Sequence, residues 1–76
     1  MVNLAKLRGL MAERGLEVNK LAGILGISRQ ATSDKLNGKS KISLTDAQAI
    51  SKALEMTNEE RDLIFFNENV KSEATR

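Results

Sequence analysis

The stretch LAGILGISRQATSDKLNGKS, residues 21–40, contains two short helical patterns joined by a glycine. Ala22 lies where a small side chain lets two helices cross closely, Gly26 makes the sharp turn, and Ile27 follows it as an apolar anchor. A helix-turn-helix needs this order of residues if its second helix is to project outward. An ordinary packed helical hairpin is the alternative, in which the turn serves only the core.

The second helix of the pair is predicted to begin at the N-cap Ser28 and to end at the Asn-Gly pair at 37–38. Helical periodicity turns Ala31, Thr32 and Leu36 inward. The side chains that remain facing water are polar: Arg29, Gln30, Ser33, Asp34 and Asn37. They form either a plain solvated surface or a surface that reads a ligand.

The rest of the chain also has a helical pattern. Apolar residues recur three and four positions apart, and no β-branched alternation interrupts them, which predicts an all-α fold. We expect a compact bundle of five short helices: about 3–14, about 18–25, about 28–37, one from the capping box at 43–46 and one from the capping box at 57–60. The predicted domain covers residues 1–68, and we expect the apolar-poor tail at 69–76 to fray.

Length and composition argue against an enzyme. A chain of 76 residues buries only roughly 60% of the surface that its unfolded form exposes, so a deep catalytic cavity is not expected. The chain has no cysteine for a disulfide or thiolate metal site, and no histidine, the commonest metal ligand and the proton carrier near neutral pH. We therefore predict no enzymatic activity, no metal and no cofactor.

Charge is distributed unevenly along the chain. Within a formal net charge of +2, residues 1–54 carry +5 and residues 55–76 carry −3. A basic body with an acidic end suits a negatively charged partner that touches one face, although ordinary solubilising charge gives the same pattern. No apolar run approaches the roughly 20 residues that span a bilayer, and the first residues lack the apolar core of a secretory signal. We expect a cytoplasmic protein without membrane contact.

Several motifs resemble those of a known family. LGISRQ at 25–30, followed by LNGKS at 36–40, resembles the lambda-repressor-like helix-turn-helix family, the Cro and cI type of phage and bacterial regulators. AQAISKAL at 47–54 is similar to that family's fourth helix, and AERGL at 12–16 is a weaker cue. The resemblance covers about residues 4–66. It implies a sequence-specific transcriptional regulator, a repressor of phage or prophage type, which binds double-stranded DNA in the major groove as a homodimer.

The resemblance also assigns residues to DNA. The positions that read base edges in the family fall here on Arg29, Gln30, Ser33 and Asp34. Arg can bind guanine and Gln can bind adenine bidentately, each pair being worth about 1–3 kcal/mol of discrimination. Phosphate contacts are implied for amides at two helix starts, namely Val18, Asn19, Ser43 and Leu44, and for the loop residues Asn37, Lys39 and Lys41. The alternative for the loop is a polar segment that is simply soluble.

Some residues depart from the family's pattern. Val18 replaces a frequent Gln, which leaves only a backbone contact there, and Glu17 is a poorer N-cap than the usual Thr. Thr32 stands where Val, Ile or Leu is usual, so we expect a looser core beneath the second helix. Asp34 either accepts a hydrogen bond from cytosine N4, restrains a neighbouring Arg or Lys, or signals a lost DNA function.

A second surface follows from the expected dimer, because one such domain touches only a few base pairs. Adjacent residues differ by about 100° around a helix, so one of the two neighbouring aromatics can face the core while the other leans outward. We predict that Phe66 packs inward with Leu63, and that Phe65 or Ile64 contributes to the dimer contact. Closure of the domain's own core by both aromatics is the alternative.

A protein-interaction module is the alternative function. Asp34 and the acidic fifth helix would suit an antitoxin, an antirepressor or an adaptor with weak or no DNA binding and a protein partner. A stoichiometric partner that stays bound when Arg29 and Gln30 are replaced would distinguish this hypothesis from the first.

Overall fold

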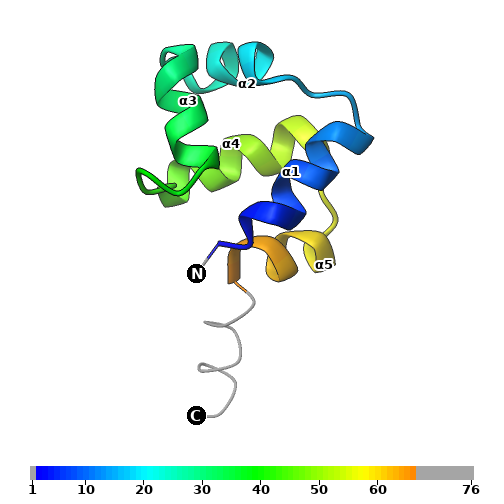
Figure 1. Ribbon diagram of the computed structural model, residues 1–76. Coiled ribbons are helices and arrows are strands. Elements are labelled where there is room, and N and C mark those ends of the chain that lie inside the picture. The colour runs from blue at the N-terminus through cyan, green and yellow to red at the C-terminus, as the bar shows by residue number, and fades with distance from the viewer. Residues whose placement is uncertain (1, 67–76) are drawn as a thin grey trace.

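Residues 2–66 are described by the computed structural model, which follows the chain from α1 to a last turn after α5 (Figure 1). The bounds are α1 Leu4–Glu13, α2 Val18–Leu25, α3 Arg29–Leu36, α4 Leu44–Leu54 and α5 Asn58–Arg61, followed by a π-helical turn at Asp62–Phe66. No strand occurs among these residues, so the predicted all-α fold of five short helices is confirmed. The predicted domain end at 68 and the predicted fraying of 69–76 lie outside the described residues.

Side-chain caps fix where four of the helices begin. Asn3, Ser28, Ser43 and Thr57 each accept a hydrogen bond from the amide three residues on, at 3.0 to 3.1 Å. At Ser43 and Thr57 the acid at that third position also accepts from the cap's own amide, which completes both predicted capping boxes. In contrast, α2 begins after Glu17 without a side-chain cap.

Two helices have a left-handed C-cap residue, and two others, α1 and α3, have a left-handed glycine directly after the cap. Gly26 ends α2 with a φ of 73°, and its amide donates to the carbonyl of Ala22 at 2.9 Å. Glu55 ends α4 with a φ of 54° and is the one non-glycine residue with positive φ in the described part of the chain. A side chain in this conformation costs roughly 1–2 kcal/mol, so α4 ends under strain that α2 avoids.

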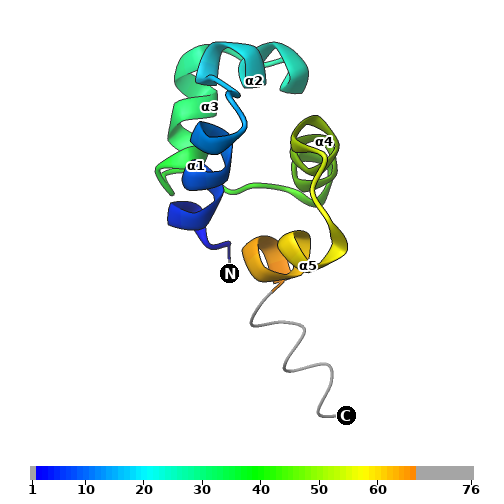
Figure 2. The same cartoon turned by 90° about the vertical axis from the view of Figure 1, so that its right-hand side faces the viewer.

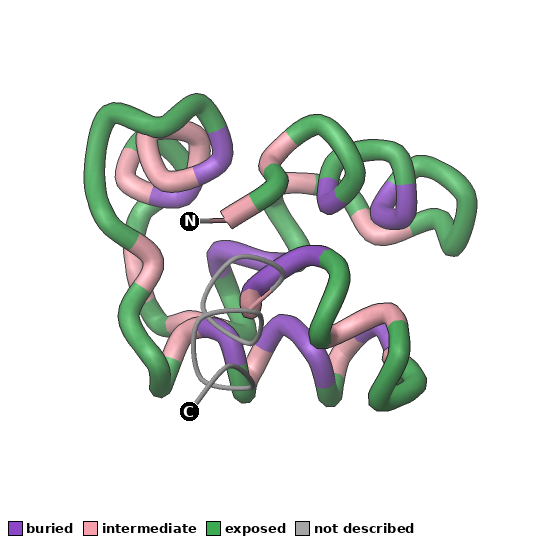
Figure 3. Tube along the Cα trace, turned by 90° about the horizontal axis from the view of Figure 1, so that it is seen from below, coloured by how far each residue is buried: buried purple, intermediate pink, exposed green. Residues whose placement is uncertain are grey.

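The helices enclose one core. Figure 2 shows α1 and α3 on one side and α4 on the other, and in both Figures 1 and 2 α2 lies across one end and α5 across the opposite end. Buried positions line the space between them (Figure 3). The core includes Leu7, Leu10 and Met11 from α1, Leu21 from α2, Leu36 from α3, Ala47, Ile50 and Leu54 from α4, and Ile64 and Phe65 from the last turn. This packing leaves the outer side of α3 uncovered by other helices.

The C-terminal aromatic turn packs differently from the prediction. Ile64 and Phe65 are 0% and 5% exposed. Leu63 is instead 51% exposed, and Phe66 is half-buried. Phe66 packs against the core but Leu63 does not, so the predicted pairing of these two residues was wrong. The assignment of Ile64 and Phe65 to a dimer contact was also wrong, because both are buried within the protomer. The packing of Phe65 and Phe66 agrees instead with the alternative, in which both aromatics close the domain's own core. The reason is the π-helical turn, which holds more residues than the α-helical period assumes.

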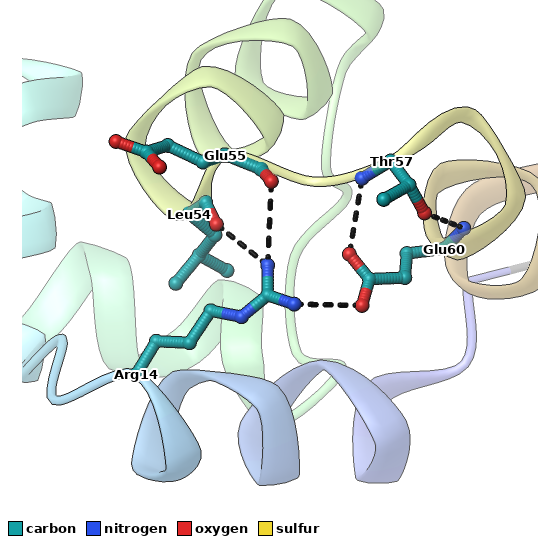
Figure 4. A network of polar contacts seen from close by, with 5 residues as sticks. All are labelled: Arg14, Leu54, Glu55, Thr57 and Glu60. Carbon is teal, nitrogen blue, oxygen red and sulfur yellow. Dashed lines mark hydrogen bonds and ion pairs between the residues drawn. The ribbon is translucent and has the colours of Figure 1, made fainter.

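Arg14, just after α1, ties three helices together (Figure 4). Its Nη1 donates to the carbonyl of Leu54 at 2.7 Å and to that of Glu55 at 3.4 Å, and its Nη2 lies 2.7 Å from Glu60 Oε2. Glu60 Oε1 also accepts from the amide of Thr57 at 3.0 Å. That backbone bond and the guanidinium hold the pKa of the Glu60 carboxyl below its ordinary value. The ends of α1 and α4 and the start of α5 therefore meet at one polar cluster.

Candidate nucleic-acid interface

The second helix of the predicted pair, α3, packs on α2, and two of its residues are buried in the core. Thr32 and Leu36 are 0% and 4% exposed. The hydroxyl of Thr32 donates to the carbonyl of Ser28 at 2.9 Å, so its polar atom has a partner inside the core. The departure from the family pattern at Thr32 therefore leaves no unpaired hydroxyl beneath the helix.

The outer face of α3 carries the residues predicted to read base edges. Arg29 and Gln30 are exposed, whereas Ser33 and Asp34 are half-buried. Within residues 2–66 the Arg29 guanidinium forms no ion pair, which leaves it available to a partner. Gln30 Nε2 donates to Asp34 Oδ1 at 3.0 Å, and Asn37 Nδ2 donates to Ser33 Oγ at a longer 3.4 Å. The side chain that Asp34 holds is therefore a glutamine, not one of the cations considered above.

A shallow groove joins the start of α3 to the start of α2. Its lining includes Arg8, Glu17, Val18, Asn19 and Arg29. Because α2 lacks a side-chain cap, its first amides are left for another acceptor, and the helix dipole makes that acceptor an anion. The structure thus brings two of the predicted phosphate-binding positions beside Arg29. The carboxylate of Glu17 works against an anion at the same place.

Arg8 was not among the predicted residues. Its Nη1 donates to the carbonyl of Leu36 at 2.9 Å, which joins α1 to the last residue of α3. The bond satisfies one of the carbonyls that a helix end leaves unpaired, and a cation is favoured there by the dipole. The two residues are 28 positions apart, so no local sequence pattern could have paired them.

Lys35 joins the end of α3 to the start of α4. Its Nζ lies 2.9 Å from Asp46 Oδ2 and donates to the carbonyl of Lys41 at 2.8 Å. Partial burial alone would raise the pKa of Asp46, but the bonds from Lys35 and Ser43 outweigh it and lower the pKa below its ordinary value. The carboxylate is therefore ionised near neutral pH and holds the intervening loop against both helices.

The loop after α3 presents three of the predicted phosphate ligands. Asn37, Lys39 and Lys41 are all exposed. The amide of Lys39 donates to the carbonyl of Asp34 at 2.8 Å, so the loop backbone is fixed to α3 while the lysine side chains remain open to solvent. This basic loop follows directly from the helix that carries the base-reading candidates.

The start of α4 fits its predicted role only in part. The amide of Ser43 donates to Asp46 Oδ2 at 3.1 Å. The prediction of a phosphate contact at Ser43 was therefore wrong for its amide, because the capping box already uses that donor. Leu44 is 64% exposed and remains a candidate through its own amide.

Neither a metal site nor a membrane span accompanies this surface in residues 2–66. No three His, Cys, Asp or Glu side chains of this range gather closely enough to hold a metal ion. Likewise, none of its helices has the length and apolar character needed to cross a bilayer.

Comparison with known proteins agrees with this geometry. A family model described as a Cro/C1-type HTH DNA-binding domain matches residues 6–67, a range that contains α2, α3 and α4 entire. Neither the curated proteins nor the solved structures give a significant match. Since the family model covers most of the sequence, the chain belongs to the Cro/C1-type family of helix-turn-helix DNA-binding domains.

Proposed function

We propose that the protein is a sequence-specific regulator of transcription, a repressor of phage or prophage type that binds double-stranded DNA as a homodimer. In this proposal α3 enters the major groove with its N-terminal end leading. The observation that carries the proposal is the exposed pair Arg29 and Gln30 at that end of α3, beside the uncapped start of α2.

Each side chain has a stated role in this arrangement. Arg29 binds guanine through O6 and N7, Gln30 binds adenine through N6 and N7, and Ser33 contacts a neighbouring base. Phosphate oxygens are bound at the two ends of the surface by the amides of Val18, Asn19 and Leu44 and by the side chains of Asn37, Lys39 and Lys41. The phosphate contacts set the register, and the base contacts set the sequence.

The dimer follows from the size of the surface. One α3 helix reaches only a few base pairs, so two copies on half-sites about one helical turn apart are needed for useful specificity. Mass measurement of the protein with and without its selected duplex tests this point. Two chains on each duplex are expected, and a single chain on a non-repeated site would contradict the dimer while leaving DNA binding in place.

Selection from pooled oligonucleotides at about 150 mM salt tests the function itself, because non-specific phosphate binding is already weakened there. An enriched sequence with two related half-sites is expected. Recovery of no enriched sequence would overturn the proposal.

Two kinds of variant separate base contacts from phosphate contacts. Arg29→Ala and Gln30→Ala are each expected to relax one base position by about 1–3 kcal/mol. Lys39→Ala should instead weaken binding to all sequences and reduce the salt slope by about one. Lys52→Ala is the matched control for DNA binding, because Lys52 lies in the last turn of α4 and is not among the predicted DNA-binding residues.

An apolar hollow favours a second candidate, the protein-interaction module. Ile24 is 44% exposed and lines a shallow hollow with Ala49, Lys52 and Ala53. An antitoxin, antirepressor or adaptor could bind its partner there while binding DNA weakly or not at all. A stoichiometric partner that co-purifies, persists in the Arg29→Ala, Gln30→Ala double variant and is lost in Ile24→Ser would favour this candidate.

A further inference from the structure

Asp34 is a fixed hydrogen-bond acceptor on α3. Its own carbonyl accepts from the amides of Lys39 and Ser40 at 2.8 and 3.4 Å, so the following loop holds its backbone. The neighbouring Lys35 is anchored to Asp46 at 2.9 Å, which fixes the same turn of the helix on α4. The carboxylate of Asp34 therefore stands on a part of α3 that has little freedom to move, while its bond to Gln30 lies at the exposed surface.

Gln30, one turn earlier, meets this acceptor with its nitrogen. Its Nε2 donates to Asp34 Oδ1 at 3.0 Å, and positions four apart are natural neighbours on a helix surface. An ionised carboxylate can only accept, so it binds the amide nitrogen and not the amide oxygen. The bond thus fixes the orientation of the Gln30 amide, with Nε2 on the side of Asp34. Without it, the last side-chain torsion of a glutamine is broad and has two nearly equal orientations.

That orientation determines which purine fits. Nε2 has two hydrogens, and the bond to Asp34 uses one, so the other hydrogen and Oε1 can still pair with adenine N7 and N6. Guanine presents acceptors at both N7 and O6, so an amide oxygen held opposite O6 is repelled. An amide that is free to turn can place its nitrogen there and tolerates guanine.

We propose that Asp34 is a positioning residue that makes Gln30 select adenine over guanine, an inference that rests on the proposed function. Asp34 acts through Gln30 and contacts no base itself. This role accounts for a carboxylate on a face that approaches phosphates, where its charge alone would weaken binding.

The base pair read by Gln30 is first identified as the position whose base preference Gln30→Ala relaxes. The test then compares two duplexes that differ only at that position, where one has an A·T pair and the other a G·C pair. Asp34→Ala is expected to lower the preference for adenine there by about two- to tenfold, the net effect of one hydrogen bond, and to tighten binding to both duplexes. In the Gln30→Ala background, Asp34→Ala should change the preference no further, because the two residues act as one unit. Glu17→Gln is the control: it removes a nearby charge but no contact with Gln30, so it should tighten binding and keep the preference.

Three results would overturn the inference while the proposed function stands. The first is an adenine preference that Asp34→Ala leaves unchanged. The second is a change of base preference at a different base pair in Asp34→Ala, which would make Asp34 itself a base-reading residue. The third is a Gln30→Ala variant that alters no base preference. A wild-type protein that selects no sequence would overturn the proposed function itself, and this inference with it.

The contact can also be tested without DNA. In NMR spectra of the free protein, the two side-chain amide protons of Gln30 should differ in their exchange with water, because one is bonded to Asp34. In Asp34→Ala the difference should fall to that of a free glutamine side chain, and in Glu17→Gln it should stay as in the wild type. A wild-type difference no larger than that of a free glutamine would exclude the contact, whatever the protein does with DNA.

Discussion

Lys35 Nζ lies 2.9 Å from Asp46 Oδ2, and this ion pair joins the last turn of α3 to the first turn of α4. The two side chains are 20% and 19% exposed, so water screens the pair less than an ordinary surface ion pair. Because Lys35 also donates to the Lys41 carbonyl, one ammonium holds the recognition helix, the basic loop and the capping box together. The position of α3 on the domain therefore depends on a residue that need not touch DNA.

Removal of this ammonium should loosen the loop. Lys35→Met keeps most of the apolar stem, and we expect it to lower the free energy of unfolding by about 1–2 kcal/mol, between the values of exposed and buried pairs. Amide exchange at Lys39 and Ser40 should become faster. Urea unfolding and hydrogen exchange measure both effects. Lys52→Met is the control, and equal losses in the two variants would contradict the role given to Lys35.

Stability should fall in acid because of two carboxylates. The pKa values of Asp46 and Glu60 are lowered in the folded protein. The unfolded chain therefore takes up protons first as the pH falls. Their contribution is fully present above the unfolded pKa values of about 4 and is lost as the pH falls through the folded values.

The urea midpoint measured between about pH 6 and about pH 3 checks this expectation. The double variant Asp46→Asn, Glu60→Gln should show a shallower decline than the wild type. Glu59→Gln is the control, since Glu59 lies on the same helix as Glu60 and has no contact with Arg14. A decline that is as steep in the double variant as in the wild type would show that other groups control the acid transition.

The packing of the C-terminal turn predicts opposite sensitivities for adjacent residues. Ile64→Val removes one buried methylene and should lower the free energy of unfolding by about 0.5–1.5 kcal/mol. Leu63→Ala removes three carbons from a side chain that is 51% exposed and should stay within about 0.5 kcal/mol of the wild type. Chemical denaturation of both variants measures the difference. A larger loss from Leu63→Ala would restore the original prediction for this turn.

A glycine at position 55 should stabilise the domain. Glu55 holds a φ of 54°, which costs a side chain roughly 1–2 kcal/mol, whereas glycine's extra freedom in the unfolded chain costs about 0.4–1 kcal/mol. Glu55→Gly should therefore raise the free energy of unfolding by about 0.5–1 kcal/mol, and the bond from Arg14 to the carbonyl should persist. Thermal unfolding measures this change in the free energy of unfolding. Glu59→Gly, inside α5, should have the opposite sign.

Local rules were enough to place the helices. Ser28, Ser43 and Thr57 cap the helices that their spacing predicted, and Gly26 makes the predicted turn. The same rules failed after Arg61, because a period of 3.6 residues misplaces side chains in a π-helical turn.

The candidate site was predictable to the extent that it depends on one helix. The exposure of Arg29 and Gln30 follows from the period of α3. The contact of Gln30 with Asp34 was not predicted, although residues four positions apart are neighbours on a helix surface. The bond from Arg8 to the end of α3 was not predictable, because it joins distant segments whose proximity only the fold determines. The exposed face of α3 was therefore predictable from the sequence, whereas the distant contacts that hold α3 in place required the structure.

The central claim is that Arg29 and Gln30 read base edges. Its most direct test is the ratio of Kd values for the selected duplex and for a scrambled duplex of equal composition, at about 150 mM salt. We predict a ratio of at least about a thousandfold in the wild type. Arg29→Ala should reduce it by about 5- to 150-fold, the equivalent of one bidentate base contact, while Lys39→Ala weakens binding to both duplexes and keeps the ratio. A ratio near one in the wild type, or one that Arg29→Ala leaves unchanged, would contradict the claim.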